Sequence, residues 1–157
     1  MTSYDYFARA EEIERVCAEI YTELARDFAD DPPVSATFRQ LANEELQHAA
    51  RIRLLRNQYR SNPSLFGQME RLEEELSAIE TDAMRLRDEV VRGVWSKDLS
   101  GVRVRLVAME DRLHVHAETM ARRADPRVRA FFETLAQQDE AHRRLCAGTP
   151  CRKAGST

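Results

Sequence analysis

Residues Phe38–Tyr59, FRQLANEELQHAARIRLLRNQY, carry a regular helical stripe. Steps of three and four residues lead through seven positions: Phe38, Leu41, Glu45, His48, Ile52, Leu55 and Tyr59. This spacing is typical of the face that a helix turns toward other helices. Glu45 and His48 interrupt the apolar line, and a buried carboxylate is costly unless its charge is compensated. Glu-x-x-His on an inward helix face is one way in which four-helix bundles hold paired metal ions.

The composition of the 157-residue chain fits a helical protein of one domain. Glycine and proline occur five times each, 32% of the residues are charged and 43% are hydrophobic. The net charge of −3, with arginines interleaved among acidic residues, predicts no nucleic-acid partner. Without a long apolar run or a secretory signal, we expect no membrane span and a cytoplasmic location. An odd number of cysteines, three, agrees with a reducing compartment.

Turn signals divide the chain into five expected helices, at about residues 3–30, 32–60, 64–92, 102–124 and 126–147. Asp31-Pro32 and Asp125-Pro126 each combine an N-cap with a first-turn proline. Breaks are expected at 61–63 and 93–101. Residues 1–147 would form one bundle, followed by a flexible tail at 148–157.

The second and fifth expected helices repeat one pattern. Asp31–His48 aligns without a gap with Asp125–His142, and eight of the 18 aligned residues are identical. The acid-x-x-His pairs coincide, and a two-residue adjustment upstream places Glu110 on Glu14. The chain is therefore interpreted as a duplicated helix hairpin, each copy of which supplies one carboxylate from its first helix and an acid-x-x-His from its second.

Together the two copies offer four acids and two histidines: Glu14, Glu45, His48, Glu110, Asp139 and His142. This is the ligand inventory of a di-metal carboxylate site in a helix bundle. Oxygen-rich ligands with one imidazole per ion suit iron or manganese, and zinc can also occupy such a site. A surface-exposed remnant of the duplication and a buried, hydrogen-bonded polar layer are the alternatives.

The helix at 64–92 is expected to return the chain along the bundle. For the carboxylates to meet at mid-bundle, the second and fourth helices must run parallel, which requires a long crossover between them. This helix has an apolar stripe and is about as long as its neighbours. A coiled coil that separates domains or binds a partner is the alternative.

The sequence resembles the ferritin-like superfamily, and within it the rubrerythrins, over about residues 4–147. The likeness is carried by ERVCAEIYTELA from Glu14, LANEELQHA around Glu45, LVAME ending at Glu110 and LAQQDEAH ending at His142. The resemblance implies an all-α, ferritin-like four-helix bundle with a long helical crossover and a site for two iron ions. Glu45 and Asp139 would bridge the ions, Glu14 and Glu110 would be terminal ligands, and each ion would bind one histidine.

Two departures from the rubrerythrin pattern affect the expected activity. The chain lacks a rubredoxin domain with two Cys-x-x-Cys pairs, so electrons would come from a separate donor protein or from Fe(II). Asp139 replaces the usual Glu, which predicts a weaker metal position on the His142 side. We interpret the chain as a di-iron oxidoreductase, of peroxidase or ferroxidase type, that reduces peroxide or oxygen, and we expect a homodimer. The alternatives are an iron-oxidising storage or buffering protein without turnover and a structural helical module with a metal staple.

Further residues near the expected ligands have candidate roles. His114, four residues after Glu110, is an additional candidate ligand that would assist the short Asp139, or else a hydrogen-bonded histidine at the edge of the core. His116 lies about 120° around the helix from Glu110 and is expected to be exposed. Tyr21 would hydrogen-bond a ligand carboxylate or take part in one-electron chemistry, and an ordinary core tyrosine is the alternative.

The three cysteines are not assigned a function at the site, and one further acid is expected to lie outside it. Cys17 is interpreted as a small buried apolar residue. Cys146 and Cys151 are interpreted as two unrelated thiols, with a redox pair as the alternative. Glu140 precedes His142 by two residues and therefore points away from it.

Overall fold

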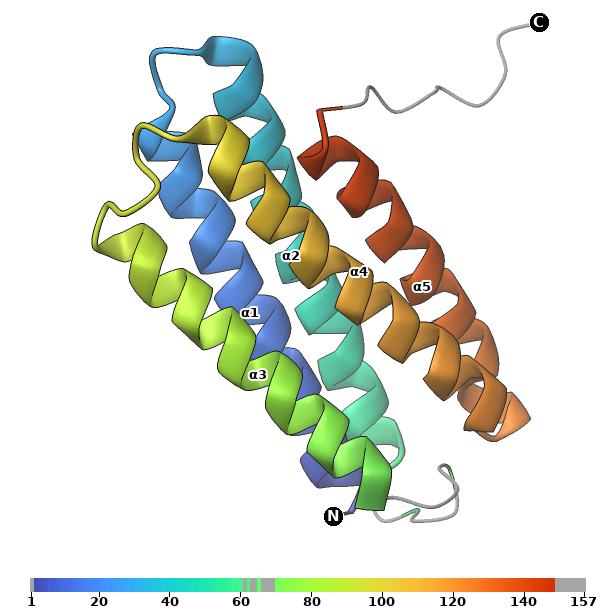
Figure 1. The fold of residues 1–157 in the computed structure, drawn as a ribbon. Coiled ribbons are helices and arrows are strands. Elements are labelled where there is room, and N and C mark those ends of the chain that lie inside the picture. Colours follow the sequence, from blue (N-terminus) through green and yellow to red (C-terminus); the bar gives the residue numbers. More distant parts are fainter. Residues whose placement is uncertain (1, 61, 63–64, 66–69, 149–157) are drawn as a thin grey trace, which may run out of the picture.

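The computed structural model describes residues 2–60, 62, 65 and 70–148, which form five α-helices (Figure 1). They are α1 (Ser3–Asp27), α2 (Pro32–Gln58), α3 (Glu70–Val91), α4 (Leu99–Arg123) and α5 (Pro126–Cys146). No strand occurs within these ranges, and the all-α prediction is confirmed. Cys151 and the expected tail beyond residue 148 lie outside the described residues, as does most of the expected break at 61–63.

The proline-containing helix starts are confirmed. α2 and α5 begin with Pro32 and Pro126, and the preceding aspartates accept a backbone N–H of the first turn with their carboxylates. α1 and α2 end at Asp27 and Gln58, a few residues before the expected ends.

α4 begins at Leu99, earlier than expected, because Asp98 supplies its N-cap. The Asp98 Oδ1 atom accepts the backbone N–H of Gly101 at 2.8 Å, so Gly101 lies in the first helical turn. Gly93, which follows α3, has a φ of 77°. This left-handed conformation favours glycine and turns the chain away from the helix axis.

The helices form two hairpins joined by a long crossover (Figure 1). α1 packs along α2 and α4 along α5, while α3 returns the chain over the outside of α1 and α4. α2 and α4 consequently run in the same direction, as predicted. This arrangement confirms the crossover interpretation of α3.

The apolar stripe of α3 explains why this helix lies against the bundle. Six of its side chains are buried: Leu72, Leu76, Ile79, Ala83, Leu86 and Val90. At its edge, Arg9 of α1 donates to Glu80 at 2.8 Å, and Arg105 of α4 lies 3.6 Å from Asp82. α3 therefore covers faces of α1 and α4 that a bundle of four helices would leave exposed. No helix in the described ranges is long and apolar enough to cross a membrane.

Candidate metal centre

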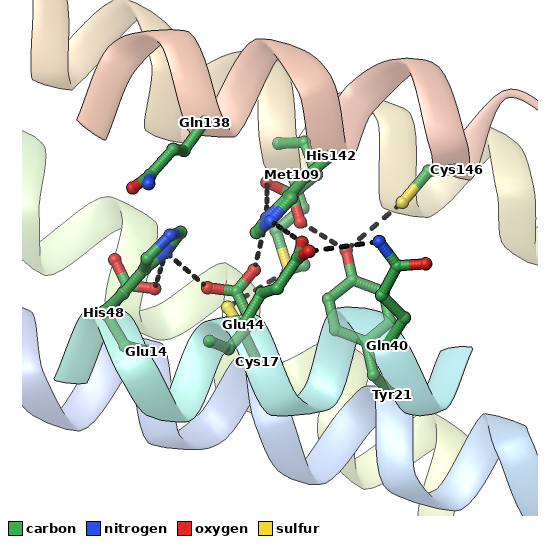
Figure 2. Close-up of polar contacts among 12 residues, drawn as sticks. Glu14, Cys17, Tyr21, Gln40, Glu44, His48, Met109, Gln138, His142 and Cys146 are labelled. Atoms are coloured by element: carbon green, nitrogen blue, oxygen red, sulfur yellow. Dashed lines mark hydrogen bonds and ion pairs between the residues drawn. The ribbon is translucent and has the colours of Figure 1, made fainter. Parts of the chain in front are cut away.

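The six predicted ligands lie close together inside the bundle, and none exposes more than 4% of its surface. They project from both hairpins: Glu14 from α1, Glu45 and His48 from α2, Glu110 from α4, Asp139 and His142 from α5. In Figure 2, Glu14 and His48 approach the cluster from one hairpin and His142 from the other. The pattern of polar residues within apolar stripes thus corresponds to a polar cluster in an apolar core.

Glu45 lies between the two histidines. Its Oε2 atom is 3.1 Å from the Nδ1 atom of His48, and its Oε1 atom is 2.9 Å from the Nδ1 atom of His142. The two imidazole rings stack with their centroids 5.1 Å apart. Both histidines therefore direct the same ring nitrogen toward one fully buried carboxylate.

Two sets of three side chains have ligand atoms close enough to share an ion. Glu45, His48 and His142 form one set, and Glu110, Asp139 and His142 form the other, with all ligand atoms of a set within 4.8 Å of one another. Glu14 Oε2 lies 3.6 Å from His48 Nδ1, beside the first set. The two sets meet at His142, so the cluster is continuous across the bundle.

Three carboxylate oxygens of this cluster are buried without a hydrogen-bond partner: Glu14 Oε2, Glu110 Oε2 and Asp139 Oδ1. Buried polar atoms are nearly always paired, because leaving one without a partner costs free energy. A cation beside these oxygens would remove that cost. Carboxylate-rich donors with two imidazole nitrogens match the preferences of iron and manganese, and the residues present fit a pair of such ions.

The carboxylates perturb one another in the absence of a cation. Burial, followed by the neighbouring Glu45, raises the pKa of Glu14 and of Glu110 to about 8. Burial and the charge of Glu14 also raise the pKa of Asp139 well above its usual range. Burial acts in the same direction on Glu45, but hydrogen bonds with Glu14 and both histidines outweigh it and hold the pKa of Glu45 below its usual range.

The two histidines compensate part of this negative charge. Burial alone would lower the pKa of each imidazole, but hydrogen bonds to acids outweigh it and raise the pKa of His48 to about 10 and that of His142 to about 12. The imidazoles are therefore protonated at neutral pH when no cation is present. Metal ions would replace these protons, as is usual where binding requires deprotonated ligands.

Glu44 is a site residue that the sequence patterns did not reveal. Its Oε2 atom lies 2.8 Å from His142 Nε2, and its Oε1 atom accepts a hydrogen bond from Gln40 at 3.1 Å. A carboxylate on the outer ring nitrogen fixes the orientation of a metal-binding histidine. Glu44 directly precedes Glu45 and lies off the apolar stripe, and its side chain is 35% exposed. Only its adjacency to Glu45 hinted at this role.

Tyr21 fills the side of the cluster next to Glu110. Its hydroxyl donates a hydrogen bond to Glu110 Oε1 and lies 3.2 Å from the Sγ atom of Cys146 (Figure 2). Of the two predicted roles, the hydrogen bond to a candidate ligand is the one seen here. Cys17 is buried as expected, with its thiol 3.9 Å from the Met109 sulfur.

The family model described as Rubrerythrin matches residues 5–148. The chain belongs to the rubrerythrin family. This confirms the predicted membership of the ferritin-like superfamily, and rubrerythrins typically bind two iron ions at carboxylate and histidine ligands. Searches of curated proteins and of solved structures found no significant match.

His114 of this rubrerythrin lies outside the ligand cluster. Its Nδ1 atom is 2.7 Å from the carbonyl oxygen of Ala136 on α5, and its Nε2 atom is 3.5 Å from Glu118. The suggestion that His114 assists Asp139 is therefore wrong, because the ring is held in the outer groove between α4 and α5. The alternative, a hydrogen-bonded histidine at the edge of the core, is confirmed.

The prediction that His116 is exposed is also wrong. Only 8% of its surface is accessible, and its Nε2 atom lies 2.9 Å from the hydroxyl of Tyr6. The packing of α3 over α4 covers this face, an effect that the spacing within α4 alone does not reveal. Glu140, in contrast, lies outside the cluster as expected and pairs with Arg143 and Arg144.

Proposed function

We propose that this rubrerythrin binds two iron ions at its buried acid–histidine cluster and acts as an oxidoreductase that reduces peroxide or oxygen. The observation that carries the proposal is the pair of three-residue ligand sets that meet at His142, next to buried carboxylate oxygens without partners. Such oxygens favour a resident cation over a purely hydrogen-bonded polar layer.

The ligand roles follow the symmetry of the two hairpins. Glu14 and Glu110 would each bind one ion, and Glu45 and Asp139 would lie between the ions. His48 and His142 would each bind one ion through Nδ1, the nitrogen that faces the cluster. Two Fe(II) ions would supply the two electrons that convert hydrogen peroxide and two protons to water, or dioxygen and two protons to hydrogen peroxide.

The surrounding residues of this chain orient and shield the ligands. Glu44 holds the outer nitrogen of His142, and the Tyr21 hydroxyl holds one oxygen of Glu110. These contacts leave the ligands few alternative orientations, so the geometry is prepared before an ion arrives. Electrons for repeated turnover would come from a separate donor protein or from further Fe(II).

Anaerobic loading followed by oxidation tests this proposal. Metal-free protein is titrated with Fe(II), and bound iron is measured after desalting. Hydrogen peroxide or dioxygen is then added, and oxidation is followed optically with and without an added reductant. We expect two ions per chain and repeated consumption of oxidant.

Glu140→Gln, a change of an acid on α5 outside the cluster, is the matched control and should behave like the wild type. Loading well beyond two ions per chain without turnover would indicate an iron-storing protein instead. Absence of iron binding would overturn the proposal.

A further inference from the structure

Tyr21 and Cys146 form a contact between the two hairpins, next to the acid–histidine cluster. Tyr21 belongs to α1 and Cys146 to α5, and the Tyr21 hydroxyl lies 3.2 Å from the Cys146 Sγ atom (Figure 2). The same hydroxyl donates a hydrogen bond to Glu110, a proposed ligand. An oxidisable phenol and a thiol therefore contact each other directly beside the proposed position of one ion.

Both side chains are shielded from solvent. Tyr21 has no exposed surface, and Cys146 exposes 1% of its own. The Tyr21 ring packs against the ring of Phe38, with the two centroids 6.2 Å apart. Oxidants and reductants in solution therefore have no direct access to the phenol or the thiol, whereas the hydrogen bond to Glu110 links the phenol to the cluster.

The second half of the duplication lacks both members of this pair. Ala117 takes the place of Tyr21, seven residues after the carboxylate ligand on the first helix of its hairpin. Ile52 takes the place of Cys146, four residues after the histidine ligand. The two replacements also lie near each other, because both line one small cavity. Phenol and thiol thus occur together in one half and are both replaced by saturated hydrocarbon side chains in the other.

Oxidation of a phenol beside a thiol has a defined outcome. Removal of one electron and one proton from Tyr21 gives a phenoxyl radical, and the hydrogen bond to Glu110 gives the proton a direct path away. The unpaired electron is shared with the ring carbons ortho to the oxygen, and these carbons lie two bonds from the atom that contacts Sγ. When sulfur bonds to one of them, one further electron and one further proton leave, and the displaced ring hydrogen restores the hydroxyl group.

We propose that the Cys146 Sγ atom and a Cε atom of Tyr21 become joined by a thioether bond when hydrogen peroxide is consumed at the cluster. One phenol, one thiol and one molecule of hydrogen peroxide give one thioether and two molecules of water. Peroxide accepts the two electrons and the two protons by way of the iron ions of the proposed function, on which this inference rests. The bond would tie α1 to α5 and hold Tyr21 against Glu110.

Peptide mass spectrometry of the full-length, iron-loaded protein tests the bond. The protein is loaded anaerobically with Fe(II) and treated with hydrogen peroxide without an added reductant. A thiol reagent then opens any disulfide, and trypsin digests the chain. We expect peptide 16–26, which contains Tyr21, to be joined to peptide 145–152, which contains Cys146, with the loss of two hydrogen atoms. Fragmentation should locate the link at Tyr21 and Cys146 rather than at Cys17 or Cys151, the other thiols of these peptides.

Three variants identify the two partners. Tyr21→Phe keeps the ring but removes the hydroxyl, and Cys146→Ser removes the sulfur, so each should abolish the joined peptide. Cys17→Ala is the matched control, because that thiol is equally buried but contacts the Met109 sulfur, and it should form the link as the wild type does. Wild-type protein treated with peroxide without iron should remain unlinked.

The outcomes separate this inference from the proposed function. Unlinked peptides in wild type whose iron has been oxidised would overturn the thioether alone, as would oxygen atoms added to Cys146 in place of the link. A joined peptide in Tyr21→Phe or in iron-free protein would also overturn it. Absence of iron binding would overturn the proposed function and the thioether together.

A second measurement needs no variant and therefore remains decisive if Tyr21→Phe and Cys146→Ser do not fold. After removal of iron and reduction of disulfides, peroxide-treated wild type should melt at a higher temperature than the untreated protein. The reason is that a covalent bond between α1 and α5 restricts the unfolded chain. Equal melting temperatures would contradict the proposed bond.

Discussion

Glu45 has no exposed surface and lies between the Nδ1 atoms of His48 and His142. Its removal would leave both imidazoles without their shared partner and the bound ions without a central ligand. We expect Glu45→Ala and His48→Ala each to lose at least one ion per chain, measured by elemental analysis after anaerobic loading. His114→Ala is the matched control, because that ring is bonded outside the cluster. Wild-type metal content in both cluster variants would refute the ligand assignment, and a large loss in His114→Ala would refute its placement.

Glu44 offers a test of an orienting contact. Glu44→Gln keeps the size of the side chain but removes the charge beside His142 Nε2. We expect the affinity for one of the two ions to fall by about tenfold, the lower end of the effect of such outer contacts. Co(II) titration with optical detection distinguishes the two binding steps. Glu140→Gln should leave both steps unchanged. Equal metal affinities in Glu44→Gln and wild type would show that the contact between Glu44 and His142 does not contribute to metal binding.

The residues that the sequence revealed are those on the apolar stripes. Glu14, Glu45 and His48 interrupt lines of apolar residues, so their burial follows from helix periodicity. Glu44 and His116 lie off the stripes, and their roles depend on which helix packs beside them. That neighbour is set by tertiary packing, which the spacing within one helix does not contain.

α5 presents the second ligand pair, and its backbone position limits what Asp139 can reach. Asp is one methylene shorter than Glu, and a packed helix resists moving toward the cluster for one ligand. We therefore expect Asp139→Glu to tighten the weaker of two unequal metal positions, the one on the His142 side. Anaerobic titration of both proteins with Fe(II) or Co(II) checks this. Two equal, tight sites in the wild type, or a weaker second site in the variant, would contradict it.

The start of α4 is an element boundary that the sequence patterns did not predict correctly. The Asp-Pro starts of α2 and α5 were predictable because proline and the N-cap give the same signal. Asp98 has no proline after it and stands between two glycines, Gly93 and Gly101, which suggested a longer break. The carboxylate of Asp98 nevertheless caps the helix, so Gly101 is helical.

The molecule as a whole should become less stable as pH rises when no metal is bound. Glu14 and Glu110 have pKa values raised from 4.5 to about 8 in the folded protein. Between pH 4.5 and about pH 8 these carboxyl groups are therefore protonated in the folded protein and ionised in the unfolded chain. The native state then binds more protons, and the free energy of unfolding falls with rising pH. The raised pKa values of His48 and His142 act in the same direction above pH 6.5.

We therefore expect the melting temperature of the metal-free protein to fall between about pH 5 and about pH 8. Metal binding requires deprotonated ligands, so the stabilisation by Fe(II) or Co(II) should increase over the same range. Thermal melts monitored by circular dichroism, with and without metal, check both trends. Matching melting temperatures with and without metal at every pH would contradict the expectation that a bound cation replaces the protons on the buried acids and histidines.

The overall architecture was more predictable than the surroundings of the cluster. The repeat, the lengths of the helices and the need for parallel α2 and α4 were sufficient to predict a crossover and hence the fold. The positions of Tyr6 and His116 were not predictable, since they depend on how α3 covers the bundle.

The covalent joining of the two hairpins through α3 has a consequence for the history of the protein. A single hairpin that paired with a copy of itself across a twofold axis would carry every substitution twice, on both sides of the axis. Once both copies belong to one chain, each half can change alone. Tyr21 is equivalent to Ala117 in the second half, and Glu45 is equivalent to Asp139. Both pairs are such one-sided changes. The fusion thus permits one half to place a tyrosine against its ligand Glu110 while the other half keeps a small alanine at the equivalent position.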